Sequence, residues 1–186
     1  MRKLVYLMNV SLDGFVEGPD GKFGWSFPDE EVHRFHNQIA REQGAFLYGR
    51  RMYETMAGWQ KAEDDPALPG FAREFARIWK ATPKIVFSST LKTVGENCRL
   101  VRGDIAAALT HLKQQPGRDL GVSGPGLASA FARLGLIDEY RLVVYPVMVG
   151  GGKSYFPAMD REVRLRLLET RTFKCGAAYF RYRPAA

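Results

Sequence analysis

Short apolar runs without alternation recur along the chain, each about the length of one strand. They lie at residues 4–8, 45–48, 85–87, 120–122 and 142–145. A continuous apolar run is typical of a strand that is covered on both faces of a parallel sheet, whereas a half-exposed strand alternates apolar and polar residues. The pattern therefore predicts a set of buried, mostly parallel strands.

Helical periodicity appears between these runs. The apolar positions spaced by three or four residues are Val32, Phe35, Ile39 and Ala40, then Ile105, Leu109 and Leu112, and finally Leu127, Phe131 and Leu134. Residues 28–31 favour a helix start, Asp104 can cap the second helix, and Gly135 can end the third. Alternation of strands and helices predicts an α/β fold whose mostly parallel sheet has helices on both faces.

One stretch departs from this alternation. Residues 58–69 carry three consecutive acidic residues and two prolines, which predicts an exposed loop. The aromatic and aliphatic residues of 71–79 then predict a short extra helix that ends near Pro83.

The end of the chain carries a hairpin signal. Residues 163–174 and 177–183 flank Cys175-Gly176. The sheet is therefore expected to finish with an antiparallel C-terminal hairpin. With no repeat or linker in the sequence, residues 1–186 are expected to form a single domain.

Composition narrows the class of protein. Apolar residues make up 46% and charged residues 25% of the chain, which are ordinary values for a globular domain and argue against disorder. Cys98 and Cys175 form no paired motif, which suits a reducing compartment. The apolar start is broken by Asn9 and Asp13, and no run approaches the roughly 20 residues of a membrane span. We expect a cytoplasmic protein that does not bind membranes.

The charge balance leaves several partners open. The chain has 27 basic and 20 acidic residues, a formal net charge of +7. Such an excess suits nucleic acid, a membrane surface or an anionic small molecule. Apart from Arg161, Arg164 and Arg166, the basic residues are scattered, whereas a nucleic-acid module concentrates them on one element. Nucleic-acid binding is therefore the weaker alternative.

The usual catalytic motifs are absent or incomplete. Residues 152–154 end like a phosphate-binding P-loop, but the first glycine of that motif would fall at Val147. His33 and His36 are three residues apart on one predicted helix, yet no third ligand accompanies them, so no metal site is expected.

Glycine-rich or hydroxyl-rich turns follow four of the predicted strands. They occupy residues 11–15, 49–52, 88–90 and 123–126. In parallel α/β sheets, ligands bind beyond the carboxyl ends of the strands, where helix N-termini present free N–H groups. Together the four turns supply backbone donors, hydroxyls and two arginines. The sequence thus predicts a cradle for a ligand that carries several phosphates.

These segments carry a family resemblance that covers nearly the whole chain, from Leu4 to Arg183. The order of the segments resembles the dihydrofolate reductase-like family of bacteria, and in particular the C-terminal reductase domain of the bifunctional deaminase–reductase of riboflavin biosynthesis. Its most specific parts are residues 11–14, 48–54, 121–126, 137–140 and 146–152. The resemblance implies a three-layer α/β fold and NADPH as the hydride donor.

Carried across position by position, the resemblance implies a set of cofactor-binding residues. At the pyrophosphate and the adenosine 2′-phosphate it places Gly49, Arg50, Arg51, Ser88 and Ser89. Under the pyrophosphate and nicotinamide ribose it places Ser123, Gly124, Gly126 and Leu127, and near the nicotinamide it places Val10 and Asp13. The residue types agree, because guanidinium groups bind phosphate by charge-assisted hydrogen bonds and glycine turns let the backbone approach closely.

A proton donor is harder to assign. In dihydrofolate reductases the acid follows a Trp-x-x-Pro segment, which here is residues 25–28, and Glu30 aligns best, with Asp29 as the alternative. Acidic residues in the first turn of a helix also complement its dipole without any catalytic role. A buried carboxyl at this position would favour a pterin as substrate, whereas an exposed one would favour a different acceptor.

The resemblance and the residues together predict an NADPH-dependent reductase. Its substrate would be a pteridine, a pyrimidine or a similar conjugated heterocycle, reduced at a C=N or C=O bond. The alternative is a member of the same fold that binds a nucleotide-type ligand without turnover. The C-terminal hairpin and the apolar strand over 142–148 are expected to support a homodimer, as the resemblance implies.

Overall fold

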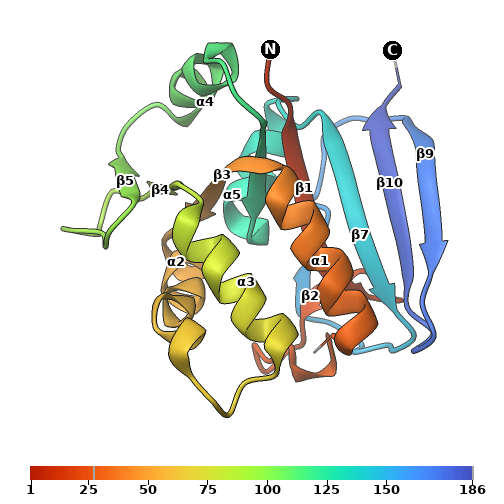
Figure 1. Cartoon of the computed structure of the whole chain (residues 1–186). Coiled ribbons are helices and arrows are strands. Elements are labelled where there is room, and N and C mark those ends of the chain that lie inside the picture. Colours follow the sequence, from red (N-terminus) through yellow and green to blue (C-terminus); the bar gives the residue numbers. More distant parts are fainter. Residues whose placement is uncertain (27, 186) are drawn as a thin grey trace.

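The computed structural model describes residues 1–26 and 28–185. Its centre is an eight-stranded sheet with the order β5-β4-β3-β6-β1-β7-β10-β9, shown in Figure 1. Every neighbouring pair from β5 to β7 is parallel, and β10 is antiparallel to both β7 and β9. The expected mixed α/β fold with antiparallel C-terminal strands is confirmed. Phe27, within the Trp-x-x-Pro segment, and Ala186, at the end of the expected domain, lie outside the described residues.

The bounds of the elements are as follows. The strands are β1 (Leu4–Ser11), β2 (Phe15–Glu17), β3 (Gln43–Gly49), β4 (Lys84–Phe87), β5 (Cys98–Val101), β6 (Asp119–Ser123), β7 (Glu139–Tyr145), β8 (Lys153–Ser154), β9 (Leu165–Thr172) and β10 (Ala178–Pro184). The α-helices are α1 (Glu30–Glu42), α2 (Arg50–Met56), α3 (Gly70–Ala81), α4 (Ile105–Gln114) and α5 (Pro125–Arg133). Three 3₁₀ turns complete the fold: η1 (Gly24–Ser26), η2 (Ala57–Gln60) and η3 (Ala62–Asp64).

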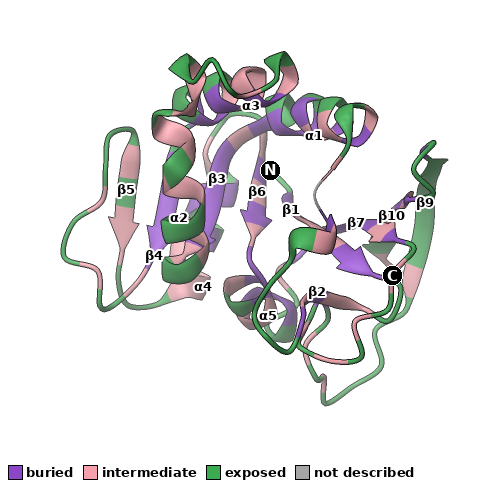
Figure 2. Ribbon diagram, turned by 90° about the horizontal axis from the view of Figure 1, so that it is seen from below, coloured by how far each residue is buried: buried purple, intermediate pink, exposed green. Residues whose placement is uncertain are grey.

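Helices cover both faces of the sheet (Figure 2). On one face, Leu109 of α4 and Phe131 of α5 are fully buried against alternate residues of the central strands. On the other face, Val32 of α1 packs on β7 and β10, and Trp79 of α3 packs on β3. Because the central strands are covered on both sides, their sequences read as continuous apolar runs.

Several local features differ from the prediction. Strand β5 and the small antiparallel β2–β8 pair were not expected, since these strands are only two to four residues long and most of their residues are only partly buried. The expected loop over 58–69 contains the turns η2 and η3 in place of an irregular chain. Leu134 was expected in the core, but it follows the last residue of α5 and is 52% exposed.

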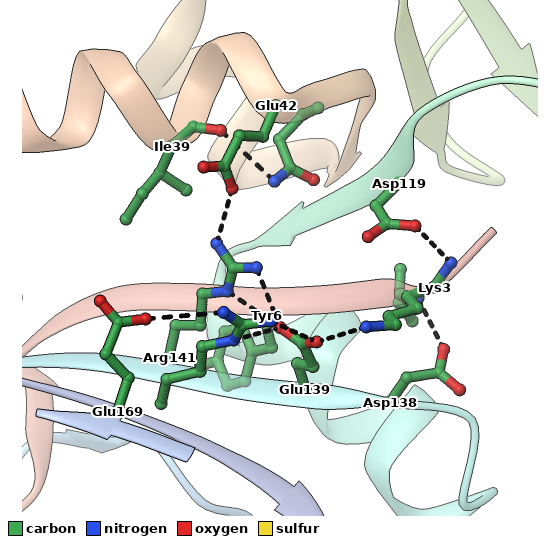
Figure 3. Close-up of polar contacts among 12 residues, drawn as sticks. Lys3, Tyr6, Ile39, Glu42, Asp119, Asp138, Glu139, Arg141 and Glu169 are labelled. Atoms are coloured by element: carbon green, nitrogen blue, oxygen red, sulfur yellow. Dashed lines mark hydrogen bonds and ion pairs between the residues drawn. The ribbon is translucent and has the colours of Figure 1, made fainter.

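A cluster of charged residues lies at the amino ends of β1 and β7, shown in Figure 3. Glu139 is only 2% exposed, and its carboxylate accepts hydrogen bonds from Lys3 Nζ at 2.8 Å, Arg141 Nη2 at 2.9 Å and Arg181 Nε at 2.8 Å. Burial alone would oppose ionisation, but these three cations outweigh it and lower the pKa of Glu139 to about 2. Glu139 therefore joins β7, β10 and the start of the chain.

Candidate functional site

The four predicted turns meet at one edge of the sheet. Strands β4, β3, β6 and β1 are consecutive in the sheet order and all parallel, so their carboxyl ends share that edge. The structure thus brings together the residues that the sequence assigned to a phosphate-binding cradle. The ion cluster around Glu139 lies at the opposite edge.

The turn between β3 and α2 is joined to the turn after β4 through Arg50. Arg50 Nη1 donates to Thr90 Oγ1 at 3.2 Å, and Arg50 Nε donates to Glu54 Oε1 at 2.8 Å. Arg51 is exposed, and its guanidinium has no ion-pair partner among the described residues. Gly49 precedes the helix, and no side chain caps that end of α2. An arginine without a partner beside an uncapped turn leaves positive charge available for an anion.

The turn after β4 is shaped by a serine hydroxyl. Ser88 Oγ accepts hydrogen bonds from the backbone N–H groups of Thr90 at 3.2 Å and Leu91 at 3.1 Å. The neighbouring Ser89 is exposed. Ser88 therefore fixes the shape of the turn, while Ser89 faces solvent.

The turn between β6 and α5 requires glycine. Gly124 has a φ of +91°, and a Cβ at this position would lie 2.8 Å from Cβ of Met52 on α2. The following helix has no side-chain cap, and Gly126 in its first turn has nothing within 4 Å of the position of a Cβ. Close packing against α2 and an open, uncapped helix start are the features of a site that a phosphate group can approach.

The same packing places two other residues that the resemblance assigned to the cofactor, Leu127 and Ser123. A Cβ on Gly49 would lie 3.6 Å from Cβ of Leu127, so the turns after β3 and β6 are in contact. Ser123 Oγ lies 3.5 Å from the carbonyl oxygen of Leu7. Leu127 of α5 therefore lies against the turn after β3, and Ser123 lies beside β1.

The loop after β1 is tied down by Asp13. Its carboxylate accepts from Ser11 Oγ at 2.5 Å and from the backbone N–H of Gly150 at 2.7 Å. The hydrogen bond from Ser11, followed by those from the backbone of Gly150 and Val149, lowers the pKa of Asp13. Val10 is buried in the core at 2% exposure, so it can offer a ligand only its backbone. In this structure Asp13 joins the β1 loop to the glycine-rich loop at 150–152.

The two candidate proton donors are exposed residues with local partners. Asp29 Oδ1 accepts from the backbone N–H of Val32 at 2.9 Å and so caps α1. Glu30 forms an ion pair with Arg34 at 2.8 Å, and both side chains are more than half exposed. Among the described residues the only buried acid is Glu139, at the far edge of the sheet.

Unpartnered polar atoms lie at the same edge, on the face covered by α1. Asn9 Oδ1, Trp25 Nε1 and Tyr145 Oη are buried, and they have no hydrogen-bond partner among the described residues. An unsatisfied buried polar atom costs about 1–3 kcal/mol. The sequence pointed to Trp25 only as the start of the Trp-x-x-Pro segment, and Asn9 and Tyr145 were not among the predicted site residues. The one available signal was the interruption of the first apolar run by Asn9.

The histidine pair of α1 holds no metal cluster, because the described residues contain no group of three or more potential ligands. His33 lies among Trp59, Phe71 and Phe75, at ring-centroid distances of 6.3, 5.0 and 5.9 Å. Burial lowers the pKa of His36 to about 4, so the ring is neutral at physiological pH. Both histidines are partly buried as residues.

Residues 2–179 match the family model of the RibD C-terminal domain. The chain belongs to this family. The uncharacterized protein YyaP of Bacillus subtilis (strain 168) is 31% identical over 184 residues, which cover 97% of this chain and 94% of YyaP. The family assignment confirms the resemblance inferred from the turns.

Solved structures show the same fold. A putative riboflavin biosynthesis protein from Shewanella sp. PV-4 is 19% identical and has a TM-score of 0.79 over 99% of both chains. Dihydrofolate reductase from Enterococcus faecalis, which was solved with NADP(H), is 14% identical and has a TM-score of 0.65 over 99% of this chain and 97% of that one. This member of the RibD C-terminal domain family therefore has a dihydrofolate reductase-like fold. Among its described helices, none is both long and apolar enough to cross a membrane.

Proposed function

We propose that this RibD C-terminal domain protein is an NADPH-dependent reductase of a conjugated heterocycle. The observation that carries the proposal is the convergence of four phosphate-type turns at one sheet edge in a member of a reductase family. NADPH, when bound, would supply a hydride to a C=N or C=O bond of the acceptor.

The residues at this edge fit such a cofactor. Arg51 and the exposed Ser89 would contact the adenosine 2′-phosphate, with Ser88 holding the turn that presents Ser89. The open helix start around Gly126 would accept the pyrophosphate, because its N–H groups have no side-chain cap. Asp13 would keep the β1 loop beside the nicotinamide by its hydrogen bonds to the loop at 149–150.

The exposed carboxylates favour an acceptor other than a pterin. Asp29 and Glu30 lie at the surface, whereas a carboxyl that holds a proton at neutral pH needs burial to raise its pKa. We therefore place riboflavin-type aminopyrimidines ahead of dihydrofolate. Binding without turnover is the alternative, and the engagement of both carboxylates in local contacts is the observation that favours it.

The proposal is tested by following NADPH oxidation at 340 nm with dihydrofolate, the aminopyrimidine ribosyl phosphate of riboflavin biosynthesis and simple quinones. Oxidation that depends on one of these acceptors supports a reductase. Tight NADPH binding without oxidation by any acceptor would instead support binding without turnover.

The cofactor preference gives a direct prediction. Wild-type protein should bind NADPH more tightly than NADH, because Arg51 offers a guanidinium to the 2′-phosphate. Arg51→Ala should weaken NADPH binding about tenfold and leave NADH binding unchanged, since one charge-assisted hydrogen bond contributes roughly 1.5–3 kcal/mol. Isothermal titration measures both affinities, and Arg77→Ala on α3, also an exposed helical arginine, is the matched control. Equal affinities of the wild type for the two cofactors would contradict this assignment.

The role of Glu30 gives a second prediction. If Glu30 supplies the proton, Glu30→Gln lowers turnover at least tenfold while NADPH affinity stays within a factor of two. Glu31→Gln is the matched control in the same first turn, because Glu31 accepts from the backbone N–H of Lys174 at 3.0 Å, away from the turns. A pH–rate profile that does not change in Glu30→Gln would remove Glu30 from the mechanism.

We also propose a homodimer that uses the C-terminal hairpin. Strand β9 is the outermost strand of the sheet and exposes Leu167 at 48% and Leu168 at 41%. An exposed edge strand of this length, with unpaired backbone groups and two exposed leucines, is a template for pairing with a second chain. Light scattering at micromolar concentration should give about 42 kDa, twice the chain mass of 21.0 kDa, and Leu167→Glu should halve it. Thr110→Glu on the exposed side of α4 should leave the dimer intact.

A further inference from the structure

A cleft lies at the amino ends of β3, β4 and β5, at the edge of the sheet opposite the four cradle turns. Its volume is about 430 Å³, in the range of pockets that hold small organic ligands. The strand starts lie side by side, because Phe46 is opposite Lys84 and Lys84 is opposite Cys98. Helix α4 lies at this end of the sheet and forms the other wall (Figure 1). We call this space the amino-end cleft, and the lining residues that matter here are Arg2, Ala45, Ile85, Cys98, Arg99 and Leu112.

The floor of the amino-end cleft is apolar. Ala45 of β3, Ile85 of β4 and Leu112 of α4 belong to one core cluster and also line the cleft. A ligand that covers this floor removes apolar surface from water, which stabilises a bound ring or hydrocarbon and gives nothing to a fully hydrated ion. The floor therefore favours a ligand with an apolar body.

Arg2 brings a positive charge to the β3 side of the cleft. Its Nε donates to the carbonyl oxygen of Arg118, whereas its two Nη atoms have no hydrogen-bond partner among the described residues. The guanidinium lies beside Gly44, where a Cβ would be 2.7 Å from Nη2, so the missing side chain leaves room for it. Burial lowers the pKa of Arg2 although Asp119 acts against this, and Asp119 Oδ1 accepts from the backbone N–H of Lys3 instead. Arg2 is thus a partly desolvated cation with free donors.

Arg99 brings a second positive charge from the β5 side. It lies opposite Ile85 in the β4–β5 register, and Ile85 packs with α4, so both side chains point to the α4 face. Arg99 is exposed and has no hydrogen-bond or ion-pair partner in the part of the chain that the structure describes. A single exposed arginine is ordinary on a protein surface. Here two guanidinium groups line one cleft, and none of its described lining residues is acidic, which is an arrangement suited to an anion.

We propose that the amino-end cleft binds an aromatic anion, a ring that carries a phosphate or a carboxylate group. The ring covers the floor of Ala45, Ile85 and Leu112, and the guanidinium groups of Arg2 and Arg99 hold the anionic group. Phosphate and carboxylate both accept paired hydrogen bonds from a guanidinium, so they are two sources of one chemistry. The cleft is separate from the cradle, and its assignment does not depend on the proposed function.

Three probes separate the parts of this proposal: 1-naphthyl phosphate, 1-naphthoate and the neutral 1-naphthol. Fluorescence titration should show that one of the two anions binds at least about tenfold more tightly than 1-naphthol, the effect of one charge-assisted hydrogen bond. The tighter of the two anions identifies the group that the arginines prefer. Inorganic phosphate, which lacks the ring, should compete at least about tenfold less well than the tighter anion. Equal affinities of the three probes would overturn the proposal.

Charge-removing variants locate the anionic group. Arg2→Gln and Arg99→Gln should each weaken binding of the tighter anion about tenfold and leave 1-naphthol binding unchanged. Arg118→Gln is the matched control, because Arg118 Nη1 donates to the carbonyl oxygen of Arg41 and does not line the cleft. Its affinity should stay within about twofold of the wild type. Loss of anion binding in Arg51→Ala, with none in Arg2→Gln, would place the anion in the cradle and overturn the assignment.

The two cysteines map the site in the unaltered chain. Cys98 lines the amino-end cleft, whereas Cys175 is exposed in the turn between β9 and β10. At about ten times its Kd, the tighter anion should slow alkylation of Cys98 by iodoacetamide about tenfold, because only about one site in eleven stays open. The rate at Cys175 should not change, and mass spectrometry of the two peptides measures both rates. An unchanged rate at Cys98, or equal slowing at both cysteines, would show that the anion does not occupy this cleft.

Discussion

Replacement of Glu139 by glutamine should lower the free energy of unfolding by about 3 kcal/mol, in the range found when one partner of a buried ion pair is removed. The carboxylate accepts hydrogen bonds from Lys3, Arg141 and Arg181, and its neutralisation leaves that excess of positive charge in a buried position. Urea unfolding followed by circular dichroism measures the change. Glu169→Gln is the control, because Glu169 pairs with Arg181 at 3.5 Å but is 47% exposed. Its loss should stay below about 1 kcal/mol.

The hydrogen bonds of the Glu139 carboxylate also make the free energy of unfolding depend on pH. The pKa of Glu139 is about 2 in the folded protein, lowered from 4.5. A lowered pKa contributes stability that is fully present above the unfolded value and is lost as the pH falls toward the folded value. Wild-type stability should therefore decline from about pH 5 to pH 2, and the decline should be shallower in Glu139→Gln. Parallel curves for the two proteins would refute the contribution of Glu139.

Replacement of Gly124 by alanine should destabilise the fold by about 3 kcal/mol and weaken NADPH binding more than tenfold. A residue with a side chain costs about 1–2 kcal/mol in the left-handed region, and overpacking adds about 1–3 kcal/mol. Here φ is +91°, and the new Cβ would lie 2.8 Å from Cβ of Met52. The strain falls on the contact between α2 and the start of α5, which holds two of the four turns together. Thermal unfolding and isothermal titration measure the two effects.

Gly126→Ala is the matched control, two residues further along. A Cβ there meets nothing within 4 Å, and alanine is the better helix former. The melting temperature should stay equal or rise. If the cofactor approaches this helix start closely, NADPH affinity should nevertheless fall. Equal destabilisation by both alanine substitutions would contradict the packing argument for Gly124.

The central fold could be predicted because its strands are buried on both faces. Burial of this kind leaves a continuous apolar run in the sequence, as in β1 and β7. The helices that connect the strands show apolar residues at helical spacing, such as Val32 and Phe35 of α1. Strand β5 and the β2–β8 pair left no such trace, since strands of two to four partly buried residues are too short to give a recognisable apolar run. The placement of Leu134 on the apolar stripe of the third helix was wrong, because this residue continues the helical spacing one residue beyond the end of α5.

The cradle turns could be found because glycine and serine after a buried strand leave a local signature. The parallel topology then brings the turns together without further information. The unpartnered polar atoms of Asn9, Trp25 and Tyr145 had no such signature, because these residues are far apart in the chain and come together only through the β1–β7 register and the position of η1. The sequence also could not show whether the carboxyl after the Trp-x-x-Pro segment is buried or exposed. The exposure of Asp29 and Glu30 depends on how α1 is oriented on the sheet.

The two edges of the sheet are chemically independent. The ion cluster of Glu139 joins the strands at their amino ends, while the four cradle turns lie at their carboxyl ends. Substitutions that alter which acceptor is bound therefore leave the anchoring ion pairs untouched. Replacements around the turns at the carboxyl ends can therefore be made while the ion pairs of Glu139 keep their contribution to stability. Such a scaffold is suited to divergence, and it offers protein engineers an edge where new specificity can be selected without a compensating stabilising change.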